Sequence, residues 1–259
     1  YARHYADEFE QVYRSLGVQS ETLRTTDLYR EGFFDPAIRI ALDHADQIRT
    51  AYESVLAEHR SEDRRGKTVA AAYPLNVRCQ GCGKLATTVV SGWDGSTITY
   101  DCPADTSVVR YVAGCGYTGS VSPFGGPAKL PWKVEWAAKW WLFETDIEGA
   151  GKDHYTKGGS RDVSLEIFRQ VFADEDVPKG RHKPMILQDL FYEWFYLGGA
   201  KMSTSKGVGA SAKEVADQVP GELLRFLMVR TKPKSGVDFE PTNEAVSRLF
   251  DEYDRVLRF

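Results

Sequence analysis

The chain has 259 residues, of which 42% are hydrophobic and 12% aromatic, and its formal net charge is −4. This composition suits a globular protein with a sizeable core. No apolar run in the sequence approaches the roughly 20 residues that cross a bilayer, and no signal-peptide pattern opens the chain. The mild acidity neither supports nor excludes a nucleic-acid partner, since a protein can confine its basic surface to one face.

The first segment is predicted to be a helix that Gly17 ends. Its apolar residues recur at helical spacing and are Tyr5, Phe9, Val12, Tyr13 and Leu16. The pattern is already under way at Tyr1, which is not a methionine, so we interpret the chain as part of a longer protein. Thr26 or Asp27 is expected to cap a short segment before Gly32.

A single long helix is predicted from about Asp35 to Glu58. Its buried stripe is expected to contain Ile38, Ile40, Ala41, Ile48, Ala51, Tyr52 and Val55. His44 and His59 lie within this helix or at its end, and without partners at ligand spacing we expect them to be surface or capping residues. The segment from Ser61 to Lys67 is predicted to be a charged linker.

Residues 73–121 are predicted to form a β module that carries all four cysteines. Cys79 and Cys82 form a C-x-x-C turn followed by glycine, while Cys102 and Cys115 lie farther along the chain. The stretch from Leu85 to Tyr100 is rich in β-forming residues around an Asp-Gly turn and indicates a hairpin. Two cysteine turns joined by a hairpin are typical of a zinc ribbon. Free or disulfide-bonded cysteines are the alternative.

The distal cysteine pair departs from that layout. Twelve residues separate Cys102 from Cys115, where a second C-x-x-C is expected. An insertion at residues 101–105 could displace one ligand, leaving Asp101, Asp105 or water in its place or a degenerate site. A complete set of four thiolates would have no open position, so such a zinc would be structural rather than catalytic.

The second half of the chain is predicted to alternate strands and helices. A hinge-like connector (122–127) precedes a helix from Trp132 to Phe143, whose tryptophans mostly pack the core. A strand at 146–148, a helix at 163–172 capped near Asp162, and strands at 185–187 and 194–197 follow. This order implies an α/β fold with a parallel sheet, in which ligands bind at the carboxyl ends of the strands.

Two polar motifs follow such strands and are expected on one rim of the sheet. They are G-K-D-H at residues 151–154 and K-M-S-T-S-K-G at residues 201–207. Lysines, hydroxyls and glycines can fold around a polyanion, because they supply charge, hydrogen bonds and close backbone approach. A solvated lysine/serine loop is the alternative. Helices are predicted beyond it at 211–219, 222–230 and 244–259.

The loop resembles the KMSKS signature of class I aminoacyl-tRNA synthetases. With K-L-P-W-K-V-E-W at residues 129–136 and G-K-D-H at 151–154, the chain is most similar to the class I lysyl-tRNA synthetases. The glutamyl, arginyl, cysteinyl and methionyl enzymes of that class are the rivals. The resemblance implies a cytoplasmic enzyme that uses ATP with Mg²⁺ to activate L-lysine and transfers the lysine to tRNA(Lys). The cysteine pattern adds structural zinc to the expected components, and no membrane partner is expected.

The resemblance and the side-chain chemistry also assign site residues. Catalytic roles fall on Lys201, Ser205 and Lys206. ATP-binding roles fall on Lys201, Met202, Ser203, Ser205, Lys206, Gly151, Asp153 and His154. Lysine recognition needs a carboxylate and apolar walls, for which Trp132, Glu135, Asp153 and His154 are candidates. An ordinary solvated helix residue is the alternative for Glu135, and a cap for Asp153. The metal ligands are Cys79, Cys82, Cys102 and Cys115.

The predicted fold is the C-terminal half of a Rossmann-like (HUP-type) parallel sheet with an inserted connective domain. The expected segments are helical (1–72), zinc-ribbon-like (73–122), catalytic (123–210) and a helical stem-contact segment (211–259). Arg225, Arg230, Lys232 and Lys234 would face the tRNA acceptor stem or form a solvated helix face.

The first class I signature, H-x-G-H, is not in this sequence. The chain alone is therefore expected to be inactive, as the partial catalytic region of an enzyme with a further anticodon domain. A non-catalytic, zinc-bearing RNA-binding fragment is the alternative.

Overall fold

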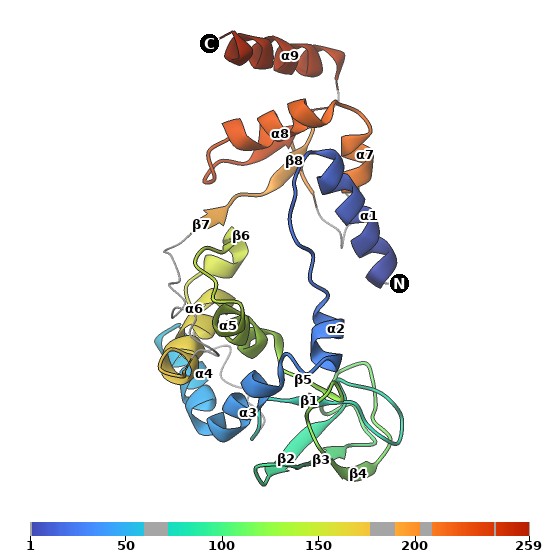
Figure 1. Cartoon of the computed structure of the whole chain (residues 1–259), viewed down its shortest axis with the longest axis vertical. Helices are drawn as coiled ribbons and strands as arrows, with labels where there is room; N and C mark the ends of the chain where they lie inside the picture. Colours follow the sequence, from blue (N-terminus) through green and yellow to red (C-terminus); the bar gives the residue numbers. More distant parts are fainter. Residues whose placement is uncertain (1, 60–71, 177–189, 203–208, 241, 259) are drawn as a thin grey trace. The chain divides into compact units, whose positions relative to one another are not determined.

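The computed structural model describes residues 2–59, 72–176, 190–202, 209–240 and 242–258 (Figure 1). Their contacts divide the chain into two compact units. The terminal unit comprises Tyr1–Thr22, Gly149–Lys152 and Asp189–Phe259, and the central unit comprises Leu23–Glu148 and Asp153–Gln188. The predicted linker at 61–67 and the predicted strand at 185–187 lie outside the described residues.

Helices form one part of the central unit. They are α2 (Thr25–Arg30), α3 (Asp35–Asp43), α4 (Ala45–His59), α5 (Trp132–Leu142) and α6 (Ser160–Ile167), which continues into a π-helical turn at Phe168–Phe172. α4 and α5 both pack against α6. Their shared core includes the fully buried side chains of Phe34, Ile38, Trp140, Ile167 and Phe172. The helix that the sequence predicts from Trp132 is confirmed, because α5 spans Trp132–Leu142.

The predicted long helix is wrong in one respect, because it is two helices that meet at His44. His44 leaves the helical region with φ −110° and ψ 29° and terminates α3. The turn lets Ile38 on α3 and Ile48 on α4 enter the same core. Ile40 and Tyr52, expected in the buried stripe, are only partly buried. The predicted cap at Thr26 or Asp27 is also wrong, since α2 begins at Thr25 without a side-chain cap.

Strands form the other part of the central unit. β2 (Val89–Trp93), β3 (Ile98–Cys102) and β4 (Tyr117–Val121) make an antiparallel sheet, and β1 (Asn76–Val77) pairs with β5 (Ala128–Lys129). The predicted hairpin is confirmed, with a turn at Gly95, whose φ of +95° suits glycine. Val90, Ile98 and Tyr100 are fully buried and anchor the sheet to the core.

The terminal unit combines short strands with helices. The strands are β6 (Gly149–Gly151), β7 (Leu190–Tyr192), β8 (Phe195–Leu197), β9 (Ala200–Lys201) and β10 (Val237–Phe239), and the helices are α1 (Ala2–Ser15), α7 (Ala212–Ala216), α8 (Gly221–Arg230) and α9 (Asn243–Leu257). α1 packs beside α7 (Figure 1). Ser211 caps α7 through a capping box with Glu214. Leu223, Leu227 and Phe239 are central to this unit's core.

The strand pairing in the terminal unit is only partly parallel. β6 pairs with β7 in parallel, β8 pairs with β10 in parallel, and β9 runs antiparallel to β8. The described strands of this unit therefore make a mixed three-stranded sheet, β10-β8-β9, and a separate parallel pair, β6-β7, and the wider Rossmann-like sheet stays a prediction. The position of the strand expected at 146–148 is wrong by three residues, because Gly149–Gly151 is the segment that pairs with β7. No helix in the described ranges has the length and apolar character needed to cross a membrane.

Candidate functional site

Strand pairing in the terminal unit brings two lysines to one short connection. Gly151 of β6 pairs with Tyr192 of β7, so Lys152 leaves its strand beside the residues that follow Tyr192. Lys201 of β9 pairs with Tyr196 of β8. The connection between β7 and β8 is Glu193-Trp194, and both lysines emerge next to it.

The two lysine side chains converge on the indole of Trp194. The Nζ atom of Lys201 lies 2.9 Å from the centroid of the ring, and that of Lys152 lies 3.9 Å from it. Lys152 also forms an ion pair with Glu193, with 2.6 Å between Nζ and Oε2. The side chain of Lys201 is exposed, whereas that of Trp194 is half-buried. The arrangement concentrates positive charge at the start of the K-M-S-T-S-K-G segment.

Only the first two residues of that segment belong to the described part of the chain. The amide of Met202 donates to the carbonyl of Phe195 (3.3 Å), which extends the β8–β9 pairing by one bond. The Met202 side chain is half-buried and lies against Gly209, beyond the loop. Ser203, Ser205 and Lys206, to which the sequence assigns phosphate contacts, lie outside the described residues.

A second group of predicted site residues lies in the central unit, at the start of α5. The indole of Trp132 stacks on that of Trp136 with 5.5 Å between centroids, and the ring of His154 meets both edge-on at 5.7 and 5.5 Å. The side chain of Trp132 is 49% exposed, whereas that of Trp140, about two turns farther along α5, is buried. One indole face is thus available to a ligand at the site the sequence indicates, with His154 beside it.

Glu135 on the same helix is already neutralised. Its carboxylate accepts from Lys129 (2.5 Å), Lys139 (2.9 Å) and the hydroxyl of Tyr29 (3.0 Å), and the side chain is only 8% exposed. Burial by itself raises the pKa of Glu135, but hydrogen bonds and charge from the two lysines outweigh it and lower the pKa. This geometry favours a structural role for Glu135 over contact with a substrate ammonium group.

The G-K-D-H motif is divided between the two units. Gly151 and Lys152 belong to the terminal unit, whereas Asp153 and His154 belong to the central unit. A 3₁₀ turn, Lys152–Tyr155, carries the chain from one to the other. Within the terminal unit, Lys152 and Lys201 both contact Trp194, but β6 and β9 belong to separate sheets, so a common rim of one sheet stays a prediction.

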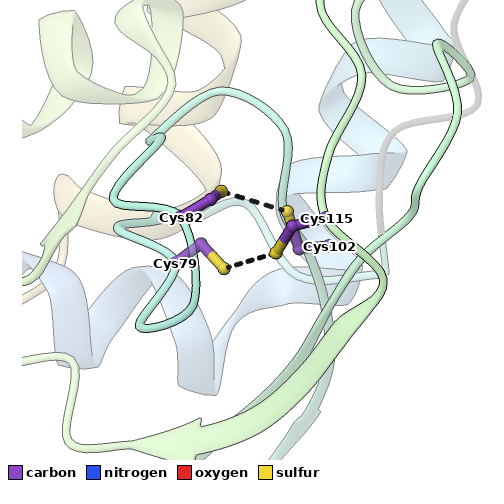
Figure 2. A group of neighbouring side chains, drawn as sticks. All are labelled: Cys79, Cys82, Cys102 and Cys115. Carbon is purple, nitrogen blue, oxygen red and sulfur yellow. Dashed lines mark hydrogen bonds between the residues drawn. The ribbon is translucent and has the colours of Figure 1, made fainter.

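The four cysteines form the third group. Their sulfur atoms all lie within 4.8 Å of one another, and the Sγ–Sγ distances are 3.6 Å for Cys79–Cys115 and 3.9 Å for Cys82–Cys102 (Figure 2). All four are free thiols, so disulfide bonds are not formed. A cluster of this kind could hold a metal ion with four sulfur ligands.

The twelve-residue spacing does not move Cys102 or Cys115 out of the cluster. Cys102 ends β3 and pairs with Tyr117 at the start of β4, so the chain between them leaves the sheet and returns beside its origin. The amide of Gly116 donates to the carbonyl of Cys102 (2.8 Å) and closes this excursion. Asp101 accepts instead from Thr118, and Asp105 from the amide of Ser107. The four thiols therefore form the cluster without either aspartate.

Close packing supports this cluster. A Cβ atom on Gly114 would lie 2.2 Å from the carbonyl oxygen of Pro103 and 2.7 Å from the sulfur of Cys102. Burial raises the pKa of the Cys79 thiol, but the amides of Cys82 and Gly81 and the neighbouring thiols outweigh it and lower the pKa to about 7. A backbone amide lowers the pKa of Cys115, but burial and hydrogen bonds with the other three thiols outweigh it and raise that pKa. The four thiols therefore titrate as a group, and metal binding would displace their remaining protons.

Three residues that the sequence did not single out shape these sites. Trp194 was assigned only to a strand, yet two lysines contact it. Glu148 accepts from the indole N–H groups of Trp136 (2.6 Å) and Trp140. Arg161 is nearly buried with its guanidinium 4.7 Å from the Trp140 ring centroid. The only sequence feature that could have indicated this role for Trp194 is its place among aromatic residues directly before the lysine/serine loop.

Known proteins are similar to this chain along its whole length. The profile of the family described as "tRNA synthetases class I (K)" matches residues 1–259. A lysine–tRNA ligase of Methanosarcina acetivorans is 38% identical over 99% of this chain and 43% of its own length. Lysine–tRNA ligases of Methanococcus maripaludis and Thermoplasma acidophilum are 35% and 30% identical, over 100% and 99% of this chain and 44% and 45% of their own. The chain spans less than half the length of these curated relatives.

Proposed function

The chain belongs to the lysine-type family of class I tRNA synthetases, and from this membership we propose that the protein activates L-lysine with ATP and transfers it to tRNA(Lys). The observation that carries the proposal is the placement of Lys201. This lysine opens the K-M-S-T-S-K-G segment at the end of β9, in a chain similar along its whole length to lysine–tRNA ligases. A synthetase of another amino acid is the alternative.

The proposed reaction has two steps. The carboxylate of lysine attacks the α-phosphate of ATP, so that pyrophosphate leaves and lysyl-adenylate forms. The 2′-hydroxyl of the terminal adenosine of the tRNA then attacks the acyl carbon, and AMP leaves. Neither step requires a protein nucleophile, so catalysis rests on positioning and on stabilising the charge of the departing pyrophosphate. The proposed metal in this step is Mg²⁺ bound with ATP, which would shield phosphate charge.

We assign the phosphate contacts to the terminal unit. Lys201 and Lys206 would stabilise the triphosphate, with Ser203 and Ser205 as hydrogen-bond donors and Gly151 allowing close approach of the backbone. The support is the exposed ammonium group of Lys201 at the end of β9. Met202, which lies against Gly209, would pack the loop.

We assign recognition of the lysine side chain to the central unit. The exposed face of Trp132 would cover the methylene stem, and Asp153 would pair with the ammonium group. His154, whose ring edge meets Trp132, would contact the amino acid or the ribose. Glu135 fits this role less well, because three donors already occupy its carboxylate.

We further propose that the four cysteines bind a structural zinc ion. Zn–S bonds of about 2.3 Å in a tetrahedron require sulfur atoms about 3.8 Å apart; Cys79–Cys115 and Cys82–Cys102 lie at 3.6 and 3.9 Å, and all four sulfurs lie within 4.8 Å of one another. Four thiolates leave no open coordination position. Zinc would therefore stabilise the module that β2, β3 and β4 build and take no part in lysine activation.

The remaining assignments follow from the family. The parallel pairs β6–β7 and β8–β10 would belong to a Rossmann-like sheet, interrupted by the zinc-ribbon-like module as a connective insertion. Lys232 and Lys234 would contact the acceptor stem, since clustered cations bind phosphates. Arg225 and Arg230 have partners in Leu16 and Glu252. Charging of tRNA would place the protein in the cytoplasm.

The decisive experiment is amino-acid-dependent exchange of pyrophosphate into ATP by the full-length protein. Lysine should support exchange. Exchange with glutamate alone would refute the lysyl assignment, and binding of tRNA without any exchange would favour the RNA-binding alternative. Lys206→Ala should lower the activation rate by about a hundredfold with little effect on lysine binding. Lys213→Ala, which removes an exposed lysine paired with Asp217, is the matched control.

A further inference from the structure

We propose that Trp194 is a positioning residue that holds the ammonium groups of Lys201 and Lys152 where an incoming polyphosphate would meet them. The inference rests on the proposed function of the Lys201 segment and assigns a role to a residue that neither motif contains. It begins with the backbone, because two strand pairings bring both lysines to the Glu193-Trp194 connection.

This connection is itself held in place on its other side. The amide of Glu193 donates to the carbonyl of Pro233 (3.0 Å), and the amide of Val237 donates to the carbonyl of Trp194 (3.2 Å). The amide of Met202 donates a hydrogen bond to the carbonyl of Phe195, the residue that follows Trp194. The indole therefore extends from a backbone fixed by hydrogen bonds on either side, which is what a platform for flexible side chains requires.

The two lysines differ in how their charge is balanced. Lys152 pairs with Glu193 at 2.6 Å in addition to its contact with the ring. Within the described part of the chain, no carboxylate pairs with Lys201, and its ammonium group rests 2.9 Å from the ring centroid. Among Lys152, Glu193 and Lys201, one positive charge is therefore in excess, which favours a negatively charged ligand.

An aromatic ring is better suited than a carboxylate to hold Lys201 ready for a phosphate. An indole face attracts an ammonium group through its quadrupole and orders the flexible stem of the lysine. The ring carries no net charge, so the ammonium group keeps its positive charge for a phosphate. A carboxylate partner would have to be displaced before Lys201 could reach a phosphate. The geometry thus restricts Lys201 near its proposed place of action while leaving its charge available.

The first test uses pyrophosphate exchange by the full-length protein. Trp194→Leu removes the ring and should lower kcat by about tenfold, with the KM for lysine unchanged. Trp194→Phe keeps a ring face and should recover most of the rate. Tyr192→Leu is the matched control, because Tyr192 is exposed on the adjoining strand and no described cation lies on its ring. Wild-type kcat in Trp194→Leu, or an equal loss in Tyr192→Leu, would overturn the proposal.

The second test needs no activity. The emission spectrum of the protein minus that of Trp194→Phe isolates the emission of Trp194. Lys201→Met, made in both backgrounds, should change this difference spectrum, because the charge next to the indole is removed. An unchanged spectrum would overturn the contact. If the spectrum changes but the wild-type protein shows no lysine-dependent exchange, the contact stands and the proposed function, with the phosphate role of Trp194, falls.

Discussion

Replacing Glu135 by glutamine separates the two roles that the sequence left open for this residue. Glutamine keeps the volume of the side chain and can still accept from Tyr29, but it removes the charge that Lys129 and Lys139 share. If Glu135 is structural, stability should fall while recognition of lysine persists. If it contacts the substrate, the reverse is expected.

The size of the effect follows from burial. Removing one partner of a fully buried ion pair costs about 3–5 kcal/mol. Glu135 is 8% exposed, but the side chains of Lys129 and Lys139 are 39% and 35% exposed, so water solvates them once the carboxylate is gone. We therefore expect a loss of about 2 kcal/mol in the free energy of unfolding at pH 7.

The pH dependence gives a second signature. The lysines hold the pKa of Glu135 below its usual value in the folded protein. Its contribution to stability is therefore fully present above the unfolded pKa of about 4.3 and is lost as the pH falls through the folded pKa. The difference in stability between the wild-type protein and Glu135→Gln should be constant near neutral pH and shrink in the acid range below about pH 4.3.

Urea unfolding followed by tryptophan emission is a suitable assay, because α5 carries four tryptophans beside Glu135. The companion measurement is the KM for lysine in pyrophosphate exchange by the full-length protein, which should stay within about twofold of wild type. Unchanged stability together with a KM raised more than about tenfold would refute the structural interpretation and place Glu135 in the substrate pocket.

Three further changes test other parts of the structure. If the cysteines bind the proposed zinc ion, Cys102→Ser should lower the zinc content below one ion per chain and destabilise the β module by several kcal/mol, measured by a chromogenic zinc assay and thermal unfolding; retention of zinc at wild-type affinity would contradict a four-thiolate site. Gly114→Ala should also weaken zinc binding, because a Cβ would meet backbone at 2.2 Å, whereas Gly92→Ala, with its nearest contact at 3.6 Å, should bind zinc normally. Ser211→Ala removes the cap of α7 and should cost about 1 kcal/mol, visible as faster amide exchange in that helix; unchanged exchange there would refute the capping contribution.

Local elements of the fold were predictable wherever the signal lies within a few residues. The hairpin between β2 and β3 follows from β-forming residues around Asp94-Gly95, and α5 and α8 follow from apolar spacing with clear ends. The break at His44 was not predictable. Apolar periodicity continues across it, since both helices face the same core, and a turn of one residue leaves no mark on the pattern.

The sequence by itself determined the family, through short motifs whose order and composition are visible along the chain, and it predicted the four cysteines as candidate metal ligands. Tertiary structure decided how those residues meet. The β3–β4 register brings Cys102 to Cys115 across twelve residues, and the pairings of β6 with β7 and β8 with β9 place two lysines on Trp194. Such contacts depend on which strands pair and in what register, and residues far apart in the chain carry no local record of that choice.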